Sequence, residues 1–226
     1  MTKSIFITAT GTDVGKTYVS ALLVKKMRGL GLNCGYYKPA LSGAKRLNDG
    51  NLLAGDCDFV LKTANLDVKP MSCLSYCFEE AVSPHLAALR QGIKIEKEVI
   101  KNNFINLSKN YDYMVVEGAG GITCPFNLED EQLLLTDVIK YLGLDIIIVA
   151  DGGLGTINSV LLTVEYAKAH NLNIKGIIFN NYDENNFMHV DNKKQIESLT
   201  NTKVLACVKK GATDIDIEYA YLVNIF

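Results

Sequence analysis

The sequence predicts an α/β fold, an open and mostly parallel β-sheet with helices on both faces, and three observations support this prediction. Short apolar runs rich in β-branched residues alternate with longer segments that carry apolar residues at helical spacing. The short runs are apolar on both faces, as the strands of a covered parallel sheet are. No linker rich in Pro, Gly or Ser divides the 226 residues and no repeat is visible, so we expect a single domain, 1–226.

The first predicted elements form a strand–helix–strand unit. The apolar run Ser4–Thr8 is predicted to be the first strand. Thr17–Leu30 is predicted to be a helix, because its apolar residues recur at helical spacing and Gly31 supplies a stop. Cys34–Lys38 is predicted to be the second strand, which Pro39 closes.

Further helices and strands are predicted along the rest of the chain. A helix is expected to begin at Asp56, in the stretch GDCDFVLK. Ser83 followed by Pro84 is typical of a helix start, with Gly92 as the end of that helix. Longer helices are predicted at Glu96–Ser108 and Thr156–Ala169, and strands at Tyr113–Val116, Asp145–Ala150, Ile174–Phe179 and Lys203–Ala206.

The composition argues against a nucleic-acid or membrane partner. The net charge is −2 with no long block of one sign, so no broad basic surface is expected. No apolar run approaches the roughly 20 residues that span a membrane, and no signal-peptide core follows Met1. Cys73 and Cys77 lack a matching Cys or His pair for a metal site. We therefore expect a cytoplasmic protein with reduced thiols.

The segment ATGTDVGKT, residues 9–17, lies between the first strand and the first helix. Its last three residues open the helix, where backbone N–H groups and the helix dipole attract phosphate. Lys16 is expected to reach the outer phosphates, and the Thr17 hydroxyl to bind Mg²⁺. Thr10 replaces the first glycine of the common phosphate-loop pattern and Gly11 follows it, so we expect the loop to take a different path. The pattern nevertheless predicts a fold of the P-loop NTPase type.

Other candidate groups fall where predicted strands end. Lys38 ends the second strand, Glu117 ends the third and Asn180 ends the fifth. Ligands of open parallel sheets bind at this edge, so we expect these side chains to lie near the phosphate loop. Glu117 is typical of an acidic residue that supports Mg²⁺. Asp56 and Asp58 are equal candidates for a metal ligand on local pattern alone, and helix capping explains Asp56 almost as well.

Five short motifs occur in an order that resembles dethiobiotin synthetase of the biotin pathway: GTDVGKT, YYKPALSG, SPH, VVEGAGG and FNN, over residues 2–182. In that family the unusual glycine spacing of the loop is normal. The resemblance implies that an amine of 7,8-diaminononanoate captures CO₂ as a carbamate. ATP with Mg²⁺ then phosphorylates the carbamate, and the second amine closes the ureido ring. The resemblance also implies a homodimer with the substrate near the subunit interface.

The same resemblance implies a role for each site residue. Lys16 would neutralise phosphate charge, Lys38 would hold the carbamate oxygens, and Thr12 with Ser42 would hydrogen-bond the substrate. Lys38, Lys16 and Thr12 are thus the expected catalytic residues. The resemblance implies metal ligands at Thr17, Asp56 and Glu117, a site for the partner's substrate carboxylate at Gly155 and Asn158, and nucleotide contacts from Asp13, Val14, Gly15, Lys16, Thr17, Tyr18, Asp56, Glu117, Gly118, Ala119, Gly120 and Asn180.

One segment departs from the family and one alternative function stays open. The family usually carries two prolines in the stretch that matches residues 203–213 and shapes the base pocket, and this chain has neither. We therefore predict weaker discrimination for adenine than is usual in the family. The alternative is a P-loop ATPase switch of the partition or division-site type, but that class carries a lysine where this chain has Gly11. For His85 we expect a neutral structural role.

Overall fold

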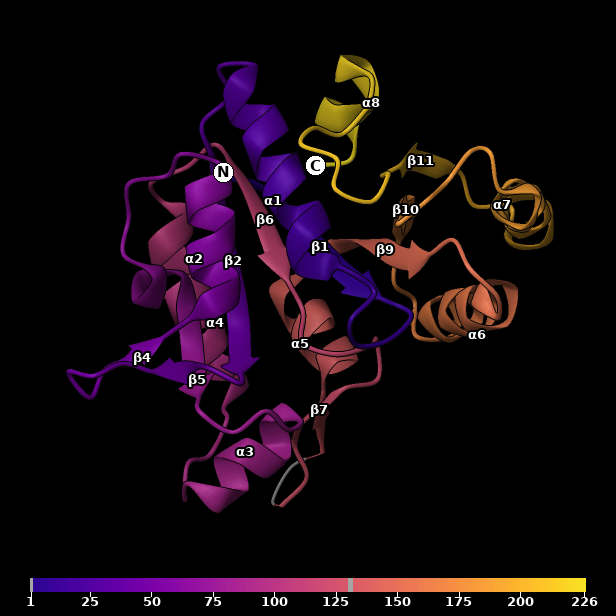
Figure 1. Cartoon of the computed structure of the whole chain (residues 1–226). Helices are drawn as coiled ribbons and strands as arrows, with labels where there is room; N and C mark the ends of the chain where they lie inside the picture. Colours follow the sequence, from indigo (N-terminus) through magenta and orange to yellow (C-terminus); the bar gives the residue numbers. More distant parts are fainter. Residues whose placement is uncertain (1, 130–131) are drawn as a thin grey trace.

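A computed structural model of the chain describes residues 2–129 and 132–226. At its centre is a sheet of seven strands: β1 (Lys3–Ala9), β2 (Cys34–Ser42), β5 (Leu74–Phe78), β6 (Tyr113–Glu117), β9 (Asp145–Asp151), β10 (Ile174–Asn180) and β11 (Val204–Cys207). The strands lie in the order β11-β10-β9-β1-β6-β2-β5, and every neighbouring pair is parallel (Figure 1). The predicted open parallel sheet is confirmed.

Helices cover both faces of this sheet. One face carries α1 (Lys16–Gly29), α2 (Gly55–Thr63), a 3₁₀ turn (Pro70–Cys73) and α8 (Tyr219–Asn224), which share one buried cluster. The other carries α3 (Pro84–Arg90), α4 (Lys97–Ser108), α5 (Leu135–Leu142), α6 (Thr156–Ala169) and α7 (Phe187–Thr200), with a second cluster. Two antiparallel pairs stand apart from the sheet, β3 (Lys45–Arg46) with β4 (Leu52–Leu53) and β7 (Pro125–Asn127) with β8 (Leu133–Leu134). Across residues 2–129 and 132–226, no helix has both the length and the apolar character needed to cross a membrane.

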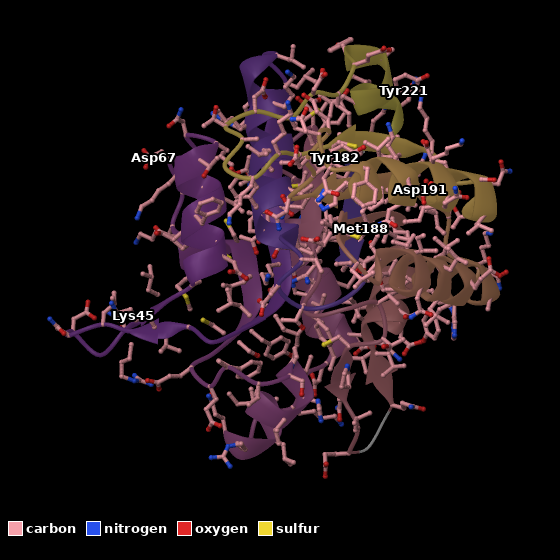
Figure 2. The ribbon with its side chains drawn as sticks, turned by 45° about the vertical axis from the view of Figure 1, so that its right-hand side comes forward. Lys45, Asp67, Tyr182, Met188, Asp191 and Tyr221 are labelled. Atoms are coloured by element: carbon pink, nitrogen blue, oxygen red, sulfur yellow. The ribbon has the colours of Figure 1, made fainter. Side chains whose placement is uncertain are left out.

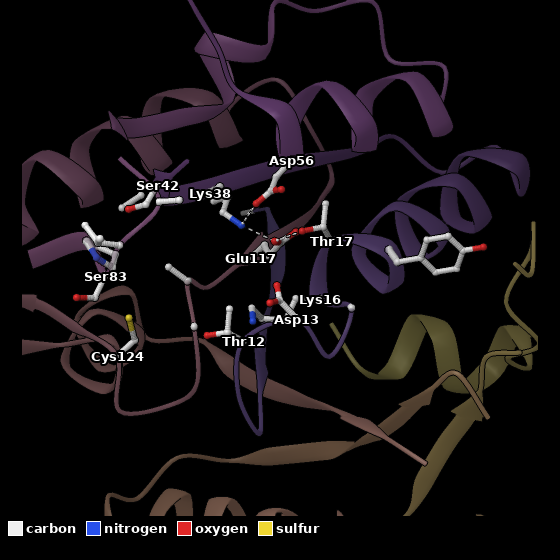
Figure 3. A pocket seen from close by; sticks show the side chains of 18 of the residues that line it. Thr12, Asp13, Lys16, Thr17, Lys38, Ser42, Asp56, Ser83, Glu117 and Cys124 are labelled. Carbon is white, nitrogen blue, oxygen red and sulfur yellow. Dashed lines mark hydrogen bonds and ion pairs between the residues drawn. The ribbon is translucent and has the colours of Figure 1, made fainter. Parts of the chain in front are cut away.

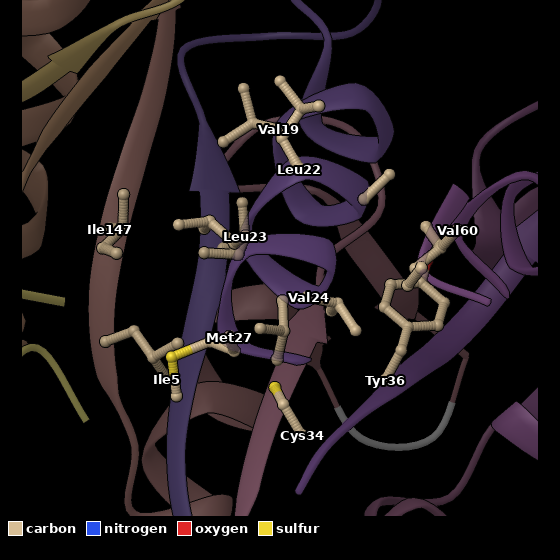
Figure 4. Close-up of a cluster of buried hydrophobic side chains, with 14 of the residues drawn as sticks. Ile5, Val19, Leu22, Leu23, Val24, Met27, Cys34, Tyr36, Val60 and Ile147 are labelled. Atoms are coloured by element: carbon tan, nitrogen blue, oxygen red, sulfur yellow. The ribbon is translucent and has the colours of Figure 1, made fainter. Parts of the chain in front are cut away.

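Side chains of β1 alternate between the two faces and hold the strand in the middle of the fold. Ile5 and Ile7 lie in the cluster with α1 and α2, whereas Phe6 lies in the cluster with α5 and α6. Figure 4 shows Ile5 close to Met27 of α1. Burying one side chain of this size contributes about 1.5–3 kcal/mol. Because β1 and α1 are packed together in this way, both ends of the loop 10–15 are fixed.

The second strand is longer than the sequence predicts. β2 does not close at Pro39 but continues to Ser42, so Lys38 lies inside the strand rather than at its end. β2 pairs with β6 up to Tyr37 and with β5 from Lys38 onward. Pro39 lies where the pairing passes from one neighbour to the other and is matched to neither. Its missing N–H therefore costs no ladder hydrogen bond, and the strand can continue through it.

Most of the other predicted elements are confirmed to within a few residues. The helix Thr156–Ala169 is found with the predicted bounds, and Lys203–Ala206 corresponds to β11. Glu96 is the residue before α4 rather than its first residue. The sequence patterns do not predict β5, α5, α7 or α8.

The C-terminal segment folds back against the sheet and α1. Ile225 belongs to the buried cluster that contains α1. The Tyr18 hydroxyl of α1 donates a hydrogen bond to the carbonyl of Ala212. Lys203 lies over the ring of Tyr221 on α8, with Nζ 3.6 Å from the ring centroid (Figure 2 labels Tyr221). These contacts bring residues 203–213 beside the helix that follows the loop 10–15.

Candidate active site

The loop between β1 and α1 turns at Asp13 and Gly15. Gly15 has φ 96°, and a Cβ there would lie 2.0 Å from the side-chain nitrogen of Asn180, so only glycine fits. Asn180 donates from Nδ2 to the carbonyl of Val14 at 3.1 Å, which ties the loop to the end of β10. Asp13 also adopts the left-handed conformation, with φ 61°. The loop therefore makes its turns without a glycine at the position of Thr10.

Side chains from four elements meet beside this loop (Figure 3). Lys38 of β2 places Nζ 2.6 Å from Asp56 Oδ2 of α2 and 2.5 Å from Glu117 Oε1 of β6. The Thr17 hydroxyl of α1 donates to the same Glu117 oxygen at 2.7 Å. Glu117 has no exposed surface and Lys38 is 4% exposed. The Lys38–Glu117 pair is therefore shielded from water and is stronger than a surface pair, whereas the Asp56 side chain is 41% exposed and its pair with Lys38 is partly screened.

The two lysines of this site have opposite pKa shifts. Burial lowers the pKa of Lys16, whose ammonium donates to the neutral carbonyl of Gly11 at 3.1 Å. Burial also opposes the charge of Lys38, but Glu117 and Asp56 outweigh it, so the pKa of Lys38 is raised. Lys38 therefore keeps its proton at neutral pH.

The oxygens of Thr17, Asp56 and Glu117 fit a hard divalent cation. Two carboxylates and a hydroxyl are ligands that Mg²⁺ prefers. The ammonium of Lys38 already lies between the two carboxylates, in the place of a cation. Within the described ranges, no group of three or more His, Cys, Asp and Glu side chains is arranged to hold a metal. A metal bound here would therefore need the Thr17 hydroxyl and further oxygen ligands, supplied by a bound small molecule or by water.

The structure separates the two aspartates that local pattern left equal. Asp56 reaches the site and contacts Lys38 at 2.6 Å. Asp58 pairs instead with Lys62, four residues later on α2, at 2.7 Å, and the side chain of Lys62 is 76% exposed. Two residues along a helix turn the side chain by about 200°, so only one of the two can face the loop.

A cavity of about 820 Å³ opens beside these side chains (Figure 3). The Ser42 hydroxyl in its wall is buried and has no hydrogen-bond partner within the part of the chain that the structure describes, so it can bond a ligand. Most of the predicted site residues line this cavity: Thr12, Asp13, Gly15, Lys16, Thr17, Tyr18, Lys38, Ser42, Asp56, Glu117, Ala119 and Gly120.

The remaining predicted residues lie outside its wall. Val14 and Asn180 are bonded to each other behind the loop. Gly118 lies against the side chain of Leu135, which a Cβ would approach to 2.8 Å. Gly155 and Asn158 lie at the start of α6, and their role toward a partner chain stays a prediction.

The cavity wall also contains residues that sequence patterns did not assign to a site. Phe59 of α2, Ala40 of β2, Cys124 and residues 81–84 complete it. In Figure 3 Ser83 and Cys124 lie on the side away from Thr17. Burial raises the pKa of Cys124 to about 11, so its thiol stays protonated at neutral pH. Cys124 follows the glycine-rich turn after β6, and this position in the sequence could have marked it as a site residue. No local sequence pattern marks Phe59.

His85 lies in the first turn of α3, next to this cavity wall. Its Nδ1 lies 2.9 Å from the Ser83 hydroxyl. Ser83 precedes α3 without a side-chain cap hydrogen bond, so its hydroxyl serves His85 instead. The structural role of His85 stays a prediction.

Solved structures with a similar fold include a cell division protein complex and a ParA family ATPase. The MinC:MinD cell division protein complex of Aquifex aeolicus has a TM-score of 0.57 and 16% identity, covering 92% of this chain and 81% of that chain. A ParA family ATPase of Chlorobium tepidum has a TM-score of 0.55 and 14% identity, covering 92% and 84%. At this level of identity, the similarity shows the fold alone and says nothing about the function of this chain.

Sequence relatives are far more similar. A family model described as an AAA domain matches residues 3–213. Two relatives from Clostridium botulinum are named ATP-dependent dethiobiotin synthetase BioD. One, from strain Alaska E43, is 48% identical over 96% of this chain and 95% of its own length. The other, from strain Langeland, is 46% identical over 100% and 99%. Taken together with the loop and the lysine–carboxylate cluster, these matches show that the chain belongs to the family of ATP-dependent dethiobiotin synthetases.

Proposed function

We propose that this chain converts 7,8-diaminononanoate and CO₂ to dethiobiotin, using ATP and releasing ADP and phosphate. The observation that carries the proposal is the meeting of Lys38 with Asp56, Glu117 and Thr17 beside the phosphate loop. The adjoining cavity of about 820 Å³ has room for a phosphate chain and a small diamine together. The names of relatives 46–49% identical to this chain support the same reaction.

The proposed chemistry has three steps. One substrate amine attacks CO₂ and loses a proton, which gives a carbamate. A carbamate oxygen then attacks the γ-phosphorus of ATP, and ADP leaves. The second amine attacks the carbonyl carbon of the resulting mixed anhydride, expels phosphate and, after losing a proton, closes the ureido ring.

The chain's own side chains would supply positioning and charge for these steps. Lys38 would hold the carbamate oxygens, since its raised pKa keeps it an ammonium at neutral pH. Thr12 and Ser42 would hydrogen-bond the substrate, and the unpaired Ser42 hydroxyl supports this, taken over the described residues. Lys16 would neutralise the transferring phosphoryl group. Phosphoryl transfer depends mainly on such positioning and electrostatic stabilisation.

Mg²⁺ is the metal that we propose for Thr17, Asp56 and Glu117, and when bound it would neutralise phosphate charge. Lys38 contacts two of these proposed ligands in the ligand-free protein. A metal on these oxygens would compete with the Lys38 ammonium for them, which would favour a turn of Lys38 from the carboxylates toward the carbamate. Nucleotide contacts would come from residues 13–18, from 118–120 and from Asn180.

We also propose a cytoplasmic homodimer. Leu154 is 93% exposed and Phe187 is 88% exposed, which is unusual for large apolar side chains. Leu154 lies next to the start of α6, where the buried Thr156 hydroxyl has no partner among the residues described. We propose that a second copy covers exposed apolar side chains such as Leu154, and sedimentation velocity at assay concentration tests it. A fully active monomer would refute the homodimer.

The cytoplasm is the proposed location, because six free thiols and the use of ATP suit that compartment.

The test of the proposed reaction is phosphate release from ATP and Mg²⁺ with and without 7,8-diaminononanoate and bicarbonate. We expect release that needs both the diamine and bicarbonate, with one phosphate per ring formed. Release that is indifferent to the diamine would indicate a nucleotide hydrolase or switch, and the roles of Lys38 and Ser42 would have to be withdrawn.

A further inference from the structure

Glu117 is held at both of its carboxylate oxygens, and only one of them takes part in the site described above. Oε1 faces the Lys38 ammonium and the Thr17 hydroxyl. Oε2 points the other way and accepts a hydrogen bond from the Tyr36 hydroxyl at 2.8 Å. Tyr36 does not line the cavity, and no step of the proposed reaction uses it.

The sheet itself brings Tyr36 to Glu117. Tyr36 lies on β2 opposite Val115 of β6, two residues before Glu117. Tyr36 and Lys38 are alternate residues of one strand and so share a face, and they contact the two different oxygens of the carboxylate. The Tyr36 ring is 1% exposed and packs in the cluster with Val60 of α2 (Figure 4). A ring packed in this way cannot swing its hydroxyl away from Glu117.

We propose that Tyr36 is a positioning residue for the metal site: its hydroxyl locks the Glu117 carboxylate so that Oε1 faces the Thr17 hydroxyl and the Lys38 ammonium. The terminal torsion of a glutamate is broad and roughly two-fold, so packing alone sets it poorly. A donor on Oε2 fixes it, as outer partners of metal ligands do. This inference rests on the proposed function, because it assumes that Glu117 is a metal ligand.

The Tyr36 hydroxyl is the donor that meets Oε2 of Glu117 in the fold. A phenylalanine in its place would keep the ring and its packing but leave Oε2 buried without this donor.

The neighbouring residue supplies a matched control. Tyr37 is also 1% exposed, but it lies in the cluster on the opposite face of the sheet. Its hydroxyl bonds to the Ser75 hydroxyl at 2.6 Å and to the Ile100 carbonyl at 3.0 Å, and neither group belongs to the site. Tyr37→Phe therefore removes the same atom from an equally buried ring without touching Glu117.

The experiment measures Mn²⁺ binding by electron paramagnetic resonance, with ADP present, for wild type, Tyr36→Phe and Tyr37→Phe. We expect Tyr36→Phe to bind Mn²⁺ about 10- to 100-fold more weakly. Tyr37→Phe should match wild type in metal affinity, although both variants lose similar thermal stability. In turnover, Tyr36→Phe should raise the KM for Mg²⁺ and recover kcat at saturating Mg²⁺.

The outcomes separate this inference from the proposed function. If the wild-type protein binds no Mn²⁺ in the presence of ADP, the proposed metal site itself is refuted. Wild type that binds, with Tyr36→Phe equal to Tyr37→Phe, would overturn the positioning role alone. If Tyr36→Phe is too unstable to titrate at 25 °C, its KM for Mg²⁺ at lower temperature decides: an unchanged KM overturns the inference.

Discussion

Replacing Lys16 by methionine should separate catalysis from folding stability. Methionine keeps the length and the apolar stem of lysine but removes the ammonium. The ammonium is held by the carbonyl of Gly11 at 3.1 Å, and Lys16 is only 7% exposed, so the charge is fixed in place before ligand binds. Losing one such preorganised group costs about 10²–10³ in kcat, or about 2.7–4 kcal/mol.

The stability of the ligand-free protein should move in the opposite direction. Burial is the largest cause of the lowered pKa of Lys16, so the folded chain binds this proton less tightly than the unfolded chain does. Below that lowered pKa the lysine is charged in both states, and the folded state carries the full cost. That cost falls as pH rises between the lowered pKa and the ordinary lysine value. Lys16→Met removes it, so the free energy of unfolding at pH 7 should rise or stay level.

Two assays test this pair of expectations. Diamine-dependent phosphate release gives kcat, and urea unfolding without ligand gives stability. Lys62→Met is the control, because Lys62 is 76% exposed on α2 and its pair with Asp58 should contribute only about 0.3–0.5 kcal/mol. A Lys16→Met rate within about threefold of wild type would refute the phosphate assignment. A clear loss of stability would show that the fold compensates the Lys16 charge.

Two further predictions concern the metal ligands and the base. Asp56→Asn should weaken Mn²⁺ binding in the presence of ADP by at least about tenfold, whereas Asp58→Asn, two residues away, should match wild type; equal losses would show that the geometry of α2 does not decide the ligand. The kcat/KM values for GTP and ATP should be comparable, because residues 203–213 lack the prolines that the family usually carries there; a preference for ATP of about a hundredfold, or about 2.7 kcal/mol, contradicts this.

Local patterns predicted the sheet and most of its helices because those elements are strongly periodic or have clear ends. α7 was missed since only Ile196 among its buried residues is apolar, the others being Asn192 and Thr200. β5 was missed because it is a short edge strand of mixed composition, LSYCF, whose middle residues are half-buried. In both elements neighbours in space, rather than the segment's own pattern, select the structure.

Candidate site residues could be predicted where a sequence motif contains them, but not where tertiary contacts alone determine their position. The strand ends brought Glu117 and the phosphate loop together as expected. Pro39 suggested a strand end that pairing with β5 removes, so Lys38 was placed at an end that does not exist. Tyr36 belongs to the motif YYKPALSG, but its proposed positioning role depends on its hydrogen bond to Oε2 of Glu117. That contact spans 81 residues of sequence, and no local pattern contains it.

The ligand-free site divides its polar groups into two kinds, and the division indicates what a ligand must supply. Lys38 is already paired with Asp56 and Glu117, whereas the Lys16 ammonium donates to the neutral carbonyl of Gly11. One neutral atom of the cavity wall is left open: among the described residues, the Ser42 hydroxyl is buried without a partner. A buried polar group without a hydrogen bond costs about 1–3 kcal/mol. A ligand that bonds the Ser42 hydroxyl recovers that cost, and an anion placed at Lys16 balances a buried charge. An anion at Lys38 must instead break two ion pairs first. The arrangement therefore favours ligands that bring an anion to Lys16 and a polar group to Ser42 over an anion that binds at Lys38 alone.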